Sequence, residues 1–363
     1  MTARLPYSYF HCLAPQAQNL EDALRILEQK FEEKLKQQNF TSRNVFCIRF
    51  FCSDVHRQAQ TIRNLWKYKE NCLMLFIGQP PLDSRFVSMQ VCLAPNCTIS
   101  KLEENTVELK HTSYRTVLSL FVPETAANSE KQSDEIIEDM KKLLNEQAMT
   151  LENHVIRTWY YIRDVDNNYA GMVKSRVRYY EECNLTPKTH FIASTGIEAC
   201  AENPHVLSWV IAEAQEGLHK EQIAYLKALS HLSPTHVYGV NFERATAITY
   251  GNCRHVRISG TASIDSKGHV VHIGNVEKQA ERTIENISEL LREGGLKLTD
   301  LQSVIIYLRD AHDYEQVKDY LSDVLPAHCA RNFVVGPVCR PDWLIEIEGE
   351  ALAPVSEPAW GNL

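Results

Sequence analysis

Four residues near the C-terminus are the most able to do chemistry: two glutamates, an arginine and a cysteine. Glu346 and Glu348 lie two residues apart in segment 343–351 (WLIEIEGEA), where they alternate with isoleucines. Because side chains alternate between the faces of a strand, we expect both carboxylates on one face. Arg331 precedes Glu346 by fifteen residues and Cys339 precedes it by seven. This set predicts proton transfer by a carboxylic acid beside an arginine that holds an anionic group.

Each of these residues also has a purely structural interpretation. Glu346 and Glu348 are compatible with the solvated face of a sheet. Arg331 is compatible with an ordinary ion pair, since we expect strand 332–338 to fold back as a hairpin that brings the guanidinium toward Glu346. Cys339 lies in the loop 337–341, and loops often carry function. A loop thiol without a nearby base is nevertheless usually inert.

The elements that must position these residues occur three times along the chain. Each copy reads as an amphipathic helix, an apolar strand with a charged end, a second helix and further strands. Aligned on the closing alanine of each copy, the position of Glu346 holds Met89 in the first copy and Trp209 in the second. A carboxylate therefore stands at this position in one copy of three. The first strand of each copy ends at an aspartate: Asp54, Asp164 and Asp310.

The pattern predicts an α+β fold of three similar lobes. The predicted lobes span residues 1–123, 134–216 and 236–354. The polar stretch 124–134 predicts a loop between the first two lobes, and the irregular segment 217–241 contains the second boundary. The predicted helices are 23–35, 58–66, 136–149, 169–183, 279–292 and 314–325, and the predicted strands include 45–54, 72–77, 86–94, 117–122, 155–164, 190–195, 206–214, 244–250, 255–259, 304–310, 332–338 and 343–351.

Composition limits the class of protein. The 363 residues suit two or three lobes, and 44% hydrophobic with 23% charged residues is typical of globular proteins. No apolar run approaches the roughly 20 residues of a membrane span, and the N-terminal segment lacks a signal-peptide pattern, so we expect a cytoplasmic protein. A net charge of −8 without a basic run disfavours nucleic acid as a partner. A small anionic substrate remains compatible if arginines gather locally.

Cysteine usage and motif searches exclude several common chemistries. The eleven cysteines are an odd number, and several lie in apolar strand patterns, which indicates reduced and buried thiols. The chain lacks zinc-ligand spacing, so we expect no metal and no cofactor. The GxSxG, GxxxxGK and GxGxxG motifs are also absent, which disfavours the common hydrolase, kinase and dinucleotide-binding classes.

The third copy resembles the Rid/YjgF family over about 110 residues. The motifs that carry the resemblance are SGTAS at 259–263, Gln279, Thr283, Asn286, LREGGL at 291–296, VIIYLRD at 304–310, Pro326-Ala327, Arg331 and IEIEGEA at 345–351. Rid proteins are trimers of a chorismate-mutase-like fold, and an arginine and a glutamate that match Arg331 and Glu346 line the clefts between their subunits. Three copies in one chain therefore resemble a covalent pseudo-trimer, a monomer whose further association is left open.

A longer part of the chain resembles the chorismatases, which embed Rid-like lobes in one polypeptide. The supporting segments are IRTWYY at 156–161, ASTG at 193–196, FERATA at 242–247, SGTASID at 259–265 and Cys339 at its spacing from Glu346. This resemblance implies cleavage of the enolpyruvyl ether of chorismate. The products would be pyruvate and either a hydroxybenzoate or a dihydroxycyclohexadienoate, with no cofactor.

The same resemblance implies roles for the candidate residues. Glu346 would deliver a proton to the methylene carbon of the enolpyruvyl group, which requires a carboxyl group that is neutral at pH 7. Because chorismate is a dianion, Arg331 and Arg244 would hold its carboxylates. The other candidates are Arg163 as a further carboxylate ligand, Tyr161 as a hydrogen-bond partner, Cys339 beside the route to product and Ala262 beside the ring.

Two other functions are compatible with the residues. In an imine or enamine deaminase of the Rid type, Arg331 would hold the substrate carboxylate and Glu346 would position water. In a catalytically silent Rid-like module, the same cleft would bind a small metabolite or a partner protein.

Overall fold

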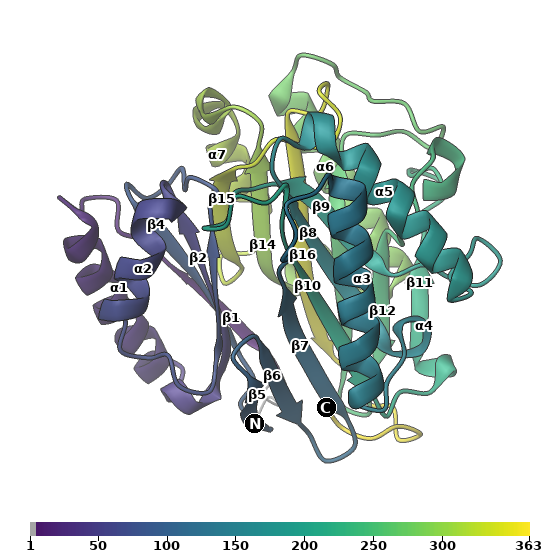
Figure 1. Cartoon of the computed structure of the whole chain (residues 1–363), viewed down its shortest axis with the longest axis horizontal. Helices are drawn as coiled ribbons and strands as arrows, with labels where there is room; N and C mark the ends of the chain where they lie inside the picture. The colour runs from purple at the N-terminus through teal and green to yellow at the C-terminus, as the bar shows by residue number, and fades with distance from the viewer. Residues whose placement is uncertain (1–4) are drawn as a thin grey trace.

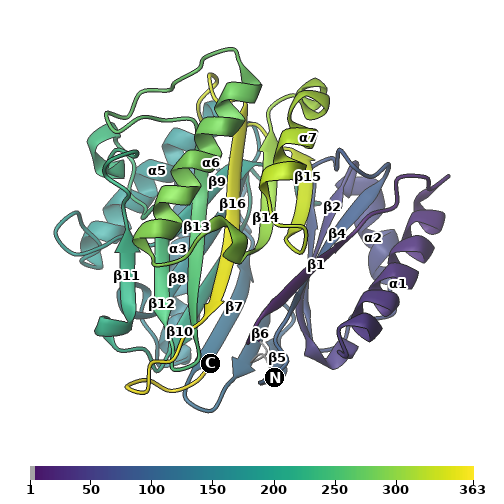
Figure 2. The same cartoon turned by 180° about the vertical axis from the view of Figure 1, so that it is seen from behind.

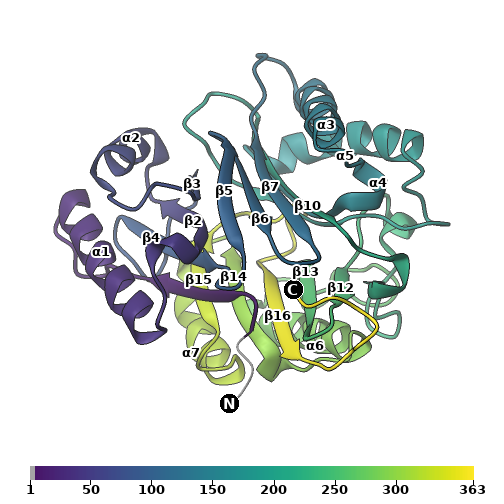
Figure 3. The ribbon, with the colours of Figure 1, turned by 90° about the horizontal axis from the view of Figure 1, so that it is seen from below.

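The architecture follows from three β-sheets that pack around a common centre. The structure is a computed structural model, and it describes residues 5–363, so the first four residues of the predicted first lobe lie outside the described part. Each sheet carries its helices on the outer face, and Figure 3 shows these helices at the periphery with the strands between them. The predicted α+β fold of three lobes is confirmed.

The first lobe is a four-stranded sheet covered by two helices, at the purple end of Figure 1. Asn19 begins helix α1 by accepting a hydrogen bond from the backbone of Asp22, as polar N-cap residues do. Leu24, Leu27 and Phe31 recur at helical spacing and are buried against the sheet. Its elements, in sheet order, are β1 (Ser8–Cys12), β4 (Val87–Leu93), β2 (Val45–Cys52) and β3 (Leu73–Ile77), with α1 (Leu20–Gln37) and α2 (Val55–Leu65).

The second lobe is a six-stranded sheet covered by a helix pair. The long helix α5 begins after Asp164, which has a positive φ of 50°. The carboxylate of Glu198 accepts hydrogen bonds from the backbone nitrogens of Asp164 and Val165, at 3.0 and 2.7 Å, and so satisfies free donors at this helix start. Its elements, in sheet order, are β5 (Thr98–Glu103), β6 (Thr106–Lys110), β7 (Arg115–Phe121), β10 (Leu207–Glu216), β8 (Val155–Ile162) and β9 (Ala193–Glu198), with α3 (Ser129–Glu146), α4 (Leu151–His154) and α5 (Val165–Glu182).

The third lobe repeats this six-stranded order, and Figure 2 shows helix α6 in front of its sheet. Asn286 of α6 donates to the carbonyl of Ala262 at 3.0 Å. The Gln279 amide donates to Asp342 O and accepts from Leu344 N, which fixes the loop before the last strand. The elements, in sheet order, are β11 (Ile223–Leu226), β12 (Ala245–Thr249), β13 (Cys253–Ala262), β16 (Ile345–Pro354), β14 (Leu301–Leu308) and β15 (Ala330–Val335), with α6 (Val276–Glu293) and α7 (Tyr314–Val324).

Sheet membership changes the predicted lobe boundaries. Strands β5 to β7, within the predicted first lobe 1–123, belong to the second sheet because β7 pairs with β10. The second sheet therefore begins at Thr98 rather than after residue 134. Strand β11 likewise joins the third sheet, which begins at Ile223 rather than after residue 236. A hairpin forms locally, but the sheet that it joins depends on long-range pairing that its own residues do not specify.

The expected hairpin between the last two strands is wrong. Strand β14 lies between β15 and β16, and it pairs in parallel with β15 and antiparallel with β16. Arg331 is therefore opposite Val304, whereas Glu346 is opposite Tyr307. The two side chains that were expected to meet stand on strands separated by a third.

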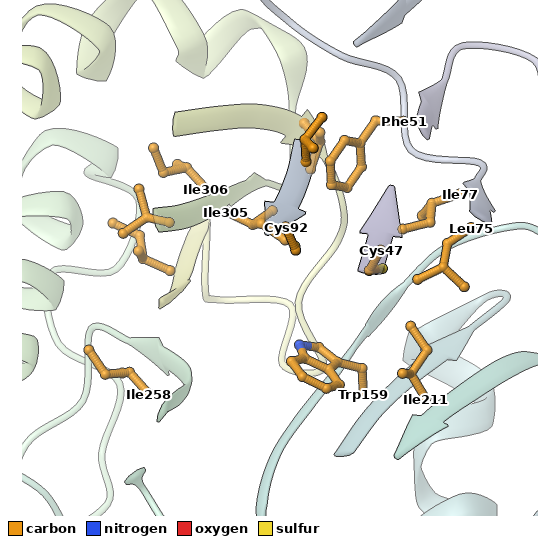
Figure 4. Close-up of a cluster of buried hydrophobic side chains, with 14 of the residues drawn as sticks. Cys47, Phe51, Leu75, Ile77, Cys92, Trp159, Ile211, Ile258, Ile305 and Ile306 are labelled. Carbon is orange, nitrogen blue, oxygen red and sulfur yellow. The ribbon is translucent and has the colours of Figure 1, made fainter. Parts of the chain in front are cut away.

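The centre of the molecule is an apolar core that all three lobes share. Figure 4 labels Cys47, Phe51 and Cys92 of the first lobe and Ile305 of the third, which belong to one buried cluster. Trp159 of the second lobe belongs to the same buried cluster. Continuous burial across the lobes means that they stabilise one another as parts of one domain. Among the helices of residues 5–363, none combines the length and apolar character needed to cross a bilayer.

Replacement of Ile305 by alanine tests this shared core. Ile305 is 2% exposed, so Ile305→Ala leaves a cavity and should reduce the free energy of unfolding by about 2–4 kcal/mol. Urea unfolding monitored by tryptophan fluorescence and circular dichroism measures the loss. The control Leu65→Ala, at a side chain 47% exposed, should change stability by less than about 0.5 kcal/mol. Equal effects of the two substitutions would contradict a core at this position.

Candidate active site

A cavity of about 150 Å³ lies at the seam between the second and third lobes. Strand β9 and helix α5 form the wall from the second lobe, and β13, β16 and the segment before β12 form the wall from the third. The two lobes meet here through bridges between Ala193 and Glu243 and between Ile197 and Val338. The lining residues are Tyr169, Arg176, Ser194, Thr195, Gly196, Tyr238, Val240, Phe242, Arg244, Gly260, Ala262, Ile264, Cys339, Arg340, Trp343 and Glu346.

Glu346 stands on β16 with its carboxyl group at the wall of this cavity. Its strand neighbours are Ala262 on β13 and Tyr307 on β14, and its side chain is 5% exposed. Within the described part of the chain, the carboxyl group forms no hydrogen bond and no ion pair. Gly260 makes room for it, because a Cβ atom at Gly260 would lie 2.1 Å from Glu346 Oε1. A larger residue at position 260 would displace the Glu346 carboxyl group from this place.

Burial makes Glu346 a protonated acid at neutral pH. The pKa of its carboxyl group is raised from 4.5 to about 8, chiefly by removal from water and secondly by the negative charge of Glu348. Arg157 and Arg244 act in the opposite direction and lower this pKa. The group therefore carries a proton near pH 7 that it can donate.

Three arginines bring positive charge to the same cavity: Arg176, Arg244 and Arg340. Arg244 is 4% exposed and donates to the carbonyl of Ser233 at 2.9 Å, while Arg176 is 1% exposed and donates to Asn241 Oδ1 at 2.8 Å. Nε of Arg244 and one terminal nitrogen of Arg176 form no hydrogen bond with any described residue. Buried donors of this kind suit a carboxylate ligand.

Aromatic rings hold the third arginine in place. The Arg340 guanidinium lies 4.7 Å from the ring centre of Tyr238 and 4.8 Å from that of Trp343, and it donates to the carbonyl of Gly268 at 3.1 Å. Stacking between rings restricts a guanidinium to one plane. Arg340 is therefore oriented before any ligand arrives.

Cys339 contributes a neutral thiol. Burial raises its pKa to about 12, and the nearby Glu346 carboxyl group acts in the same direction. A thiol with this pKa is not a thiolate nucleophile at physiological pH. Cys339 therefore lines the cavity wall next to the acid as a neutral thiol.

The structure brings some predicted site residues together and separates others. Glu346, Cys339, Arg244 and Ala262 all line the cavity. Three predicted residues lie elsewhere: Arg331, Tyr161 and Arg163. The predicted acid thus has one of its predicted arginines beside it.

Arg331 lies at the seam between the third and first lobes. Its guanidinium donates to the carbonyl of Ser322 at 3.2 Å, and its backbone nitrogen donates to His11 Nδ1 on β1 at 3.2 Å. Arg331 pairs with the residue six positions before Asp310. In the second lobe, the residue six positions before Asp164 pairs with Ser194, so Ser194 is the counterpart of Arg331. Strand β9 packs against β13 of the third lobe, and β15 packs in the same way against β1 and β4 of the first lobe. Arg331 therefore faces the first lobe, whereas the wall opposite Glu346 presents Ser194.

Tyr161 and Arg163 are both remote from the cavity. Tyr161 is buried on β8, where its ring meets Trp209 edge-on with centres 6.5 Å apart. Arg163 follows the same strand and donates to the carbonyl of Asn203 at 2.9 Å. The resemblance to the chorismatases implied that both residues lie at the site, but the seam uses β9 of this lobe instead.

Sequence reasoning missed several cavity residues. Arg340 follows Cys339 directly and could have been found from its place in the same loop. Arg176 and Thr195 come from the second lobe, and no spacing relates them to Glu346, so only the packing of the lobes reveals them.

A second cavity of about 140 Å³ shares Phe242 and Arg244 with the first, so Arg244 stands between two chambers.

The fold and the site together define a three-lobe α+β protein with an enclosed acid and several arginines at one seam. Residues 244–353 match the family described as Endoribonuclease L-PSP. The 3-aminoacrylate deaminase RutC of Acinetobacter baylyi is 33% identical over 97 residues, which cover 26% of this chain and 77% of that protein. The chain belongs to this RutC family, which is also called Rid/YjgF.

Similarity over a longer stretch is to chorismate enzymes. A 3-hydroxybenzoate synthase of Streptomyces hygroscopicus is 27% identical over 217 residues, which cover 54% of this chain and 62% of that relative. The match therefore spans less than two thirds of the relative's length. A crystal structure of a chorismatase superposes with a TM-score of 0.68 at 18% identity, covering 96% of this chain and all of that chain. At that identity the superposition establishes the shared fold.

The raised pKa of Glu346 predicts that the difference in unfolding free energy between wild type and Glu346→Gln depends on pH. Between about pH 4.5 and 8 the folded protein keeps a proton that the unfolded chain releases. The stability that Glu346 contributes is therefore complete below pH 4.5 and is lost as the pH rises toward 8. Glu346→Gln lacks this loss, so its unfolding free energy relative to wild type should rise by about 2–4 kcal/mol from pH 5 to pH 8.5.

Urea unfolding at several pH values measures this difference. Glu285→Gln is the control, because that side chain is 61% exposed, and its difference from wild type should stay level across the same range. A level difference for Glu346→Gln as well would show that the carboxyl group ionises normally.

Proposed function

We propose that the chain cleaves the enolpyruvyl ether of chorismate and releases pyruvate, with Glu346 as the proton donor. One observation carries the proposal: a carboxyl group with a pKa of about 8 lies in an enclosed cavity with Arg176, Arg244 and Arg340. An acid that is neutral at pH 7 and a cationic wall are the two requirements of this reaction on a dianionic substrate.

The chemistry begins at the methylene carbon of the enolpyruvyl group. Transfer of the Glu346 proton to this carbon converts the enol ether into an oxocarbenium ion and leaves a glutamate anion. Water adds to the cation to give a hemiketal, which collapses by breaking the bond to the ether oxygen and releases pyruvate and the dihydroxycyclohexadienoate. A ring hydroxyl group that adds instead gives a cyclic ketal. Cleavage of that oxygen from its ring carbon leaves it as the keto oxygen of pyruvate, and the ring loses a carbon-bound proton, which the freed ether oxygen takes up, to give the hydroxybenzoate. The proton lost by the attacking hydroxyl group restores Glu346, so no oxidant, metal or cofactor is consumed.

The arginines of the cavity bind the two carboxylates of the substrate in this proposal. Arg244 and Arg340 come from the third lobe and Arg176 from the second, so the substrate would bridge the seam. Arg244 lowers the pKa of Glu346 in the free protein. A substrate carboxylate paired with Arg244 would cancel this effect and keep the acid protonated.

Small and neutral side chains shape the space around the ring. Ala262 lies opposite Glu346 on the neighbouring strand, and the Cys339 thiol lines the same wall. In this proposal Ala262 leaves room for the ring and Cys339 influences how the cation is captured. The product beside pyruvate is a hydroxybenzoate or a dihydroxycyclohexadienoate, and the name of the Streptomyces relative supports the first.

A Rid-type deaminase is the second candidate, supported by the name of the Acinetobacter relative. That function pairs an arginine at the position of Arg331 with a glutamate of the neighbouring lobe. Here Arg331 faces the first lobe, and the seam of Glu346 presents Ser194 at the corresponding register. This arrangement favours the chorismate-cleaving proposal.

Two assays separate the candidate functions. Pyruvate release from chorismate separates the chorismate-cleaving function from the deaminase and from a silent binding module. An assay with imines of 2-aminoacrylate separates the deaminase from the silent module.

Removal of the acidic proton should abolish turnover of chorismate. Glu346→Gln keeps the shape of the side chain but cannot donate a carboxylic proton, so kcat for pyruvate release should fall at least about 100-fold. Lactate dehydrogenase coupled to NADH oxidation measures the pyruvate. Glu285→Gln, an exposed amide variant, should keep wild-type rates. Wild-type turnover by Glu346→Gln would remove the residue from the proposed role.

Two arginine variants test the placement of the carboxylate site. Arg244→Met keeps the apolar stem and should raise KM for chorismate about 10- to 100-fold, because a charge-assisted hydrogen bond is lost. Arg331→Met is the matched control and should stay within about twofold of the wild-type KM, since Arg331 lies at another seam. A larger effect of Arg331→Met than of Arg244→Met would overturn this assignment.

A further inference from the structure

Glu348 is a buried carboxylate that the proposed chemistry does not use. It lies on β16 two residues after Glu346, is 3% exposed, and its partners come from other lobes. Arg157 of the second lobe donates to its Oε2 at 2.7 Å, and Trp159 donates to its Oε1 at 3.0 Å. Arg49 of the first lobe lies 3.8 Å from the same Oε1. All three lobes therefore meet at one carboxyl group.

Thr195 connects this carboxyl group to the wall of the cavity. Its hydroxyl group donates to Glu348 Oε2 and accepts from Arg157 at 2.6 Å and from the backbone nitrogen of Gly260 at 2.9 Å. Gly260 is the residue against which the Glu346 carboxyl group lies. The hydrogen bonds of Glu348 thus lead directly to the backbone that positions the acid.

We propose that Glu348 is a positioning residue: it pairs with Arg157 and Arg49 of the other two lobes, and its negative charge favours the neutral form of the neighbouring Glu346. Two residues along a strand separate the two side chains by roughly 7 Å on the same face. At this distance within a protein, two negative charges oppose each other strongly. The negative charge of Glu348 thereby favours retention of the proton on Glu346. The inference deepens the proposed function, because it concerns the acid of that site.

The charged and titratable groups around Glu346 and Glu348 agree with a neutral Glu346 beside a charged Glu348. Facing Glu346 are Glu348, Arg157 and Arg244, together with the cavity's Arg176 and Arg340 and the neutral Cys339 and Tyr169. Facing Glu348 are Arg49, Arg157 and the phenols of Tyr161 and Tyr307, and burial raises the pKa of both phenols, so they stay neutral. Glu348 thus pairs directly with Arg157 at 2.7 Å, whereas the carboxyl group of Glu346 has no direct cationic partner among the described residues. The charge of Glu348 is the second cause, after burial, of the raised Glu346 pKa.

The proposal assigns a role to the first lobe. Within the described residues, the first lobe supplies no side chain to the cavity at the seam of Glu346. It supplies Arg49, whose guanidinium also stacks 4.7 Å from the centre of the Trp159 ring. In this proposal the first lobe acts on the acid through Arg49 and Glu348.

Glu348→Gln tests the proposal by the titration of Glu346. Loss of the negative charge, with Arg157 retained, should lower the Glu346 midpoint by roughly one to two pH units. Carbon-13 labelling of the glutamate side-chain carboxyl groups allows the titration to be followed by NMR without substrate. The Glu346 signal is the one that Glu346→Gln lacks.

Glu350→Gln is the matched control on the same face of β16. The Glu350 side chain is 16% exposed and pairs with His255 at 2.6 Å, but it lies about twice as far along the strand. Its loss should move the Glu346 midpoint by less than half the shift caused by Glu348→Gln. A Glu346 midpoint in Glu348→Gln at or above the wild-type value would overturn the proposal, and so would an equal downward shift in both variants.

If Glu348→Gln does not fold, a double variant tests the proposal instead. Glu348→Gln with Arg157→Gln removes an anion and a cation together, which buried pairs often tolerate. Glu348 affects the Glu346 pKa more than Arg157 does, so the midpoint should still fall, by less than in the single variant. A midpoint at or above the wild-type value in the double variant overturns the proposal.

Kinetics separate this inference from the proposed function. If wild type releases pyruvate, the alkaline limb of kcat in Glu348→Gln should move to lower pH, with a several-fold loss at pH 8 that disappears at pH 6. A merely structural role would lower kcat equally at both pH values and would overturn the inference. If wild type releases no pyruvate, the proposed function fails, while the NMR titration still decides the role of Glu348.

Discussion

The interaction on which the structure depends is the buried ion pair of Glu348. Burial of a carboxylate is costly unless cations and hydrogen bonds compensate it. Among the described residues of its own lobe, none supplies the compensating cation. Arg157 comes from the second lobe and Arg49 from the first, so this charge is stable only when the three sheets are assembled in one register. The shared apolar core in Figure 4 includes Trp159, which donates to Glu348, and its burial adds the hydrophobic contribution to stability.

Fusion of three lobes in one chain allows the seams to differ. In a trimer of identical subunits every seam would contain the same residues. Here the seam between the second and third lobes has Glu346, Gly260 and a wall of arginines, while the seam of the third and first lobes has Arg331 beside His11. The other lobes can then support one acid instead of repeating it. The family relationship explains the fold, and the unequal seams explain why the proposed chemistry is confined to one of them.

Several features of the site could be predicted because they are local. The alternation of Glu346 with isoleucines and the adjacent Cys339 loop are properties of one strand and its approach. The strand opposite, with Gly260 and Ala262, belongs to the same lobe and follows from its hairpin. Arg331 was misplaced because its strand is parallel to β14, and a parallel neighbour is not visible in the spacing between two segments. Arg176 could not be predicted at all, since a helix of another lobe carries it.

The sequence by itself determined the repeated helices and strands, the single acidic strand and the family to which the third lobe belongs. Hydrophobic periodicity and turn residues act over a few residues, so they can be read along the chain. The tertiary structure alone decided that β5 to β7 join the second sheet, that Ser194 rather than Arg331 stands opposite Glu346, and that the acid is protonated. These outcomes depend on burial and on charges brought together from distant segments, because electrostatic energies depend on distance and solvent exposure in the folded state.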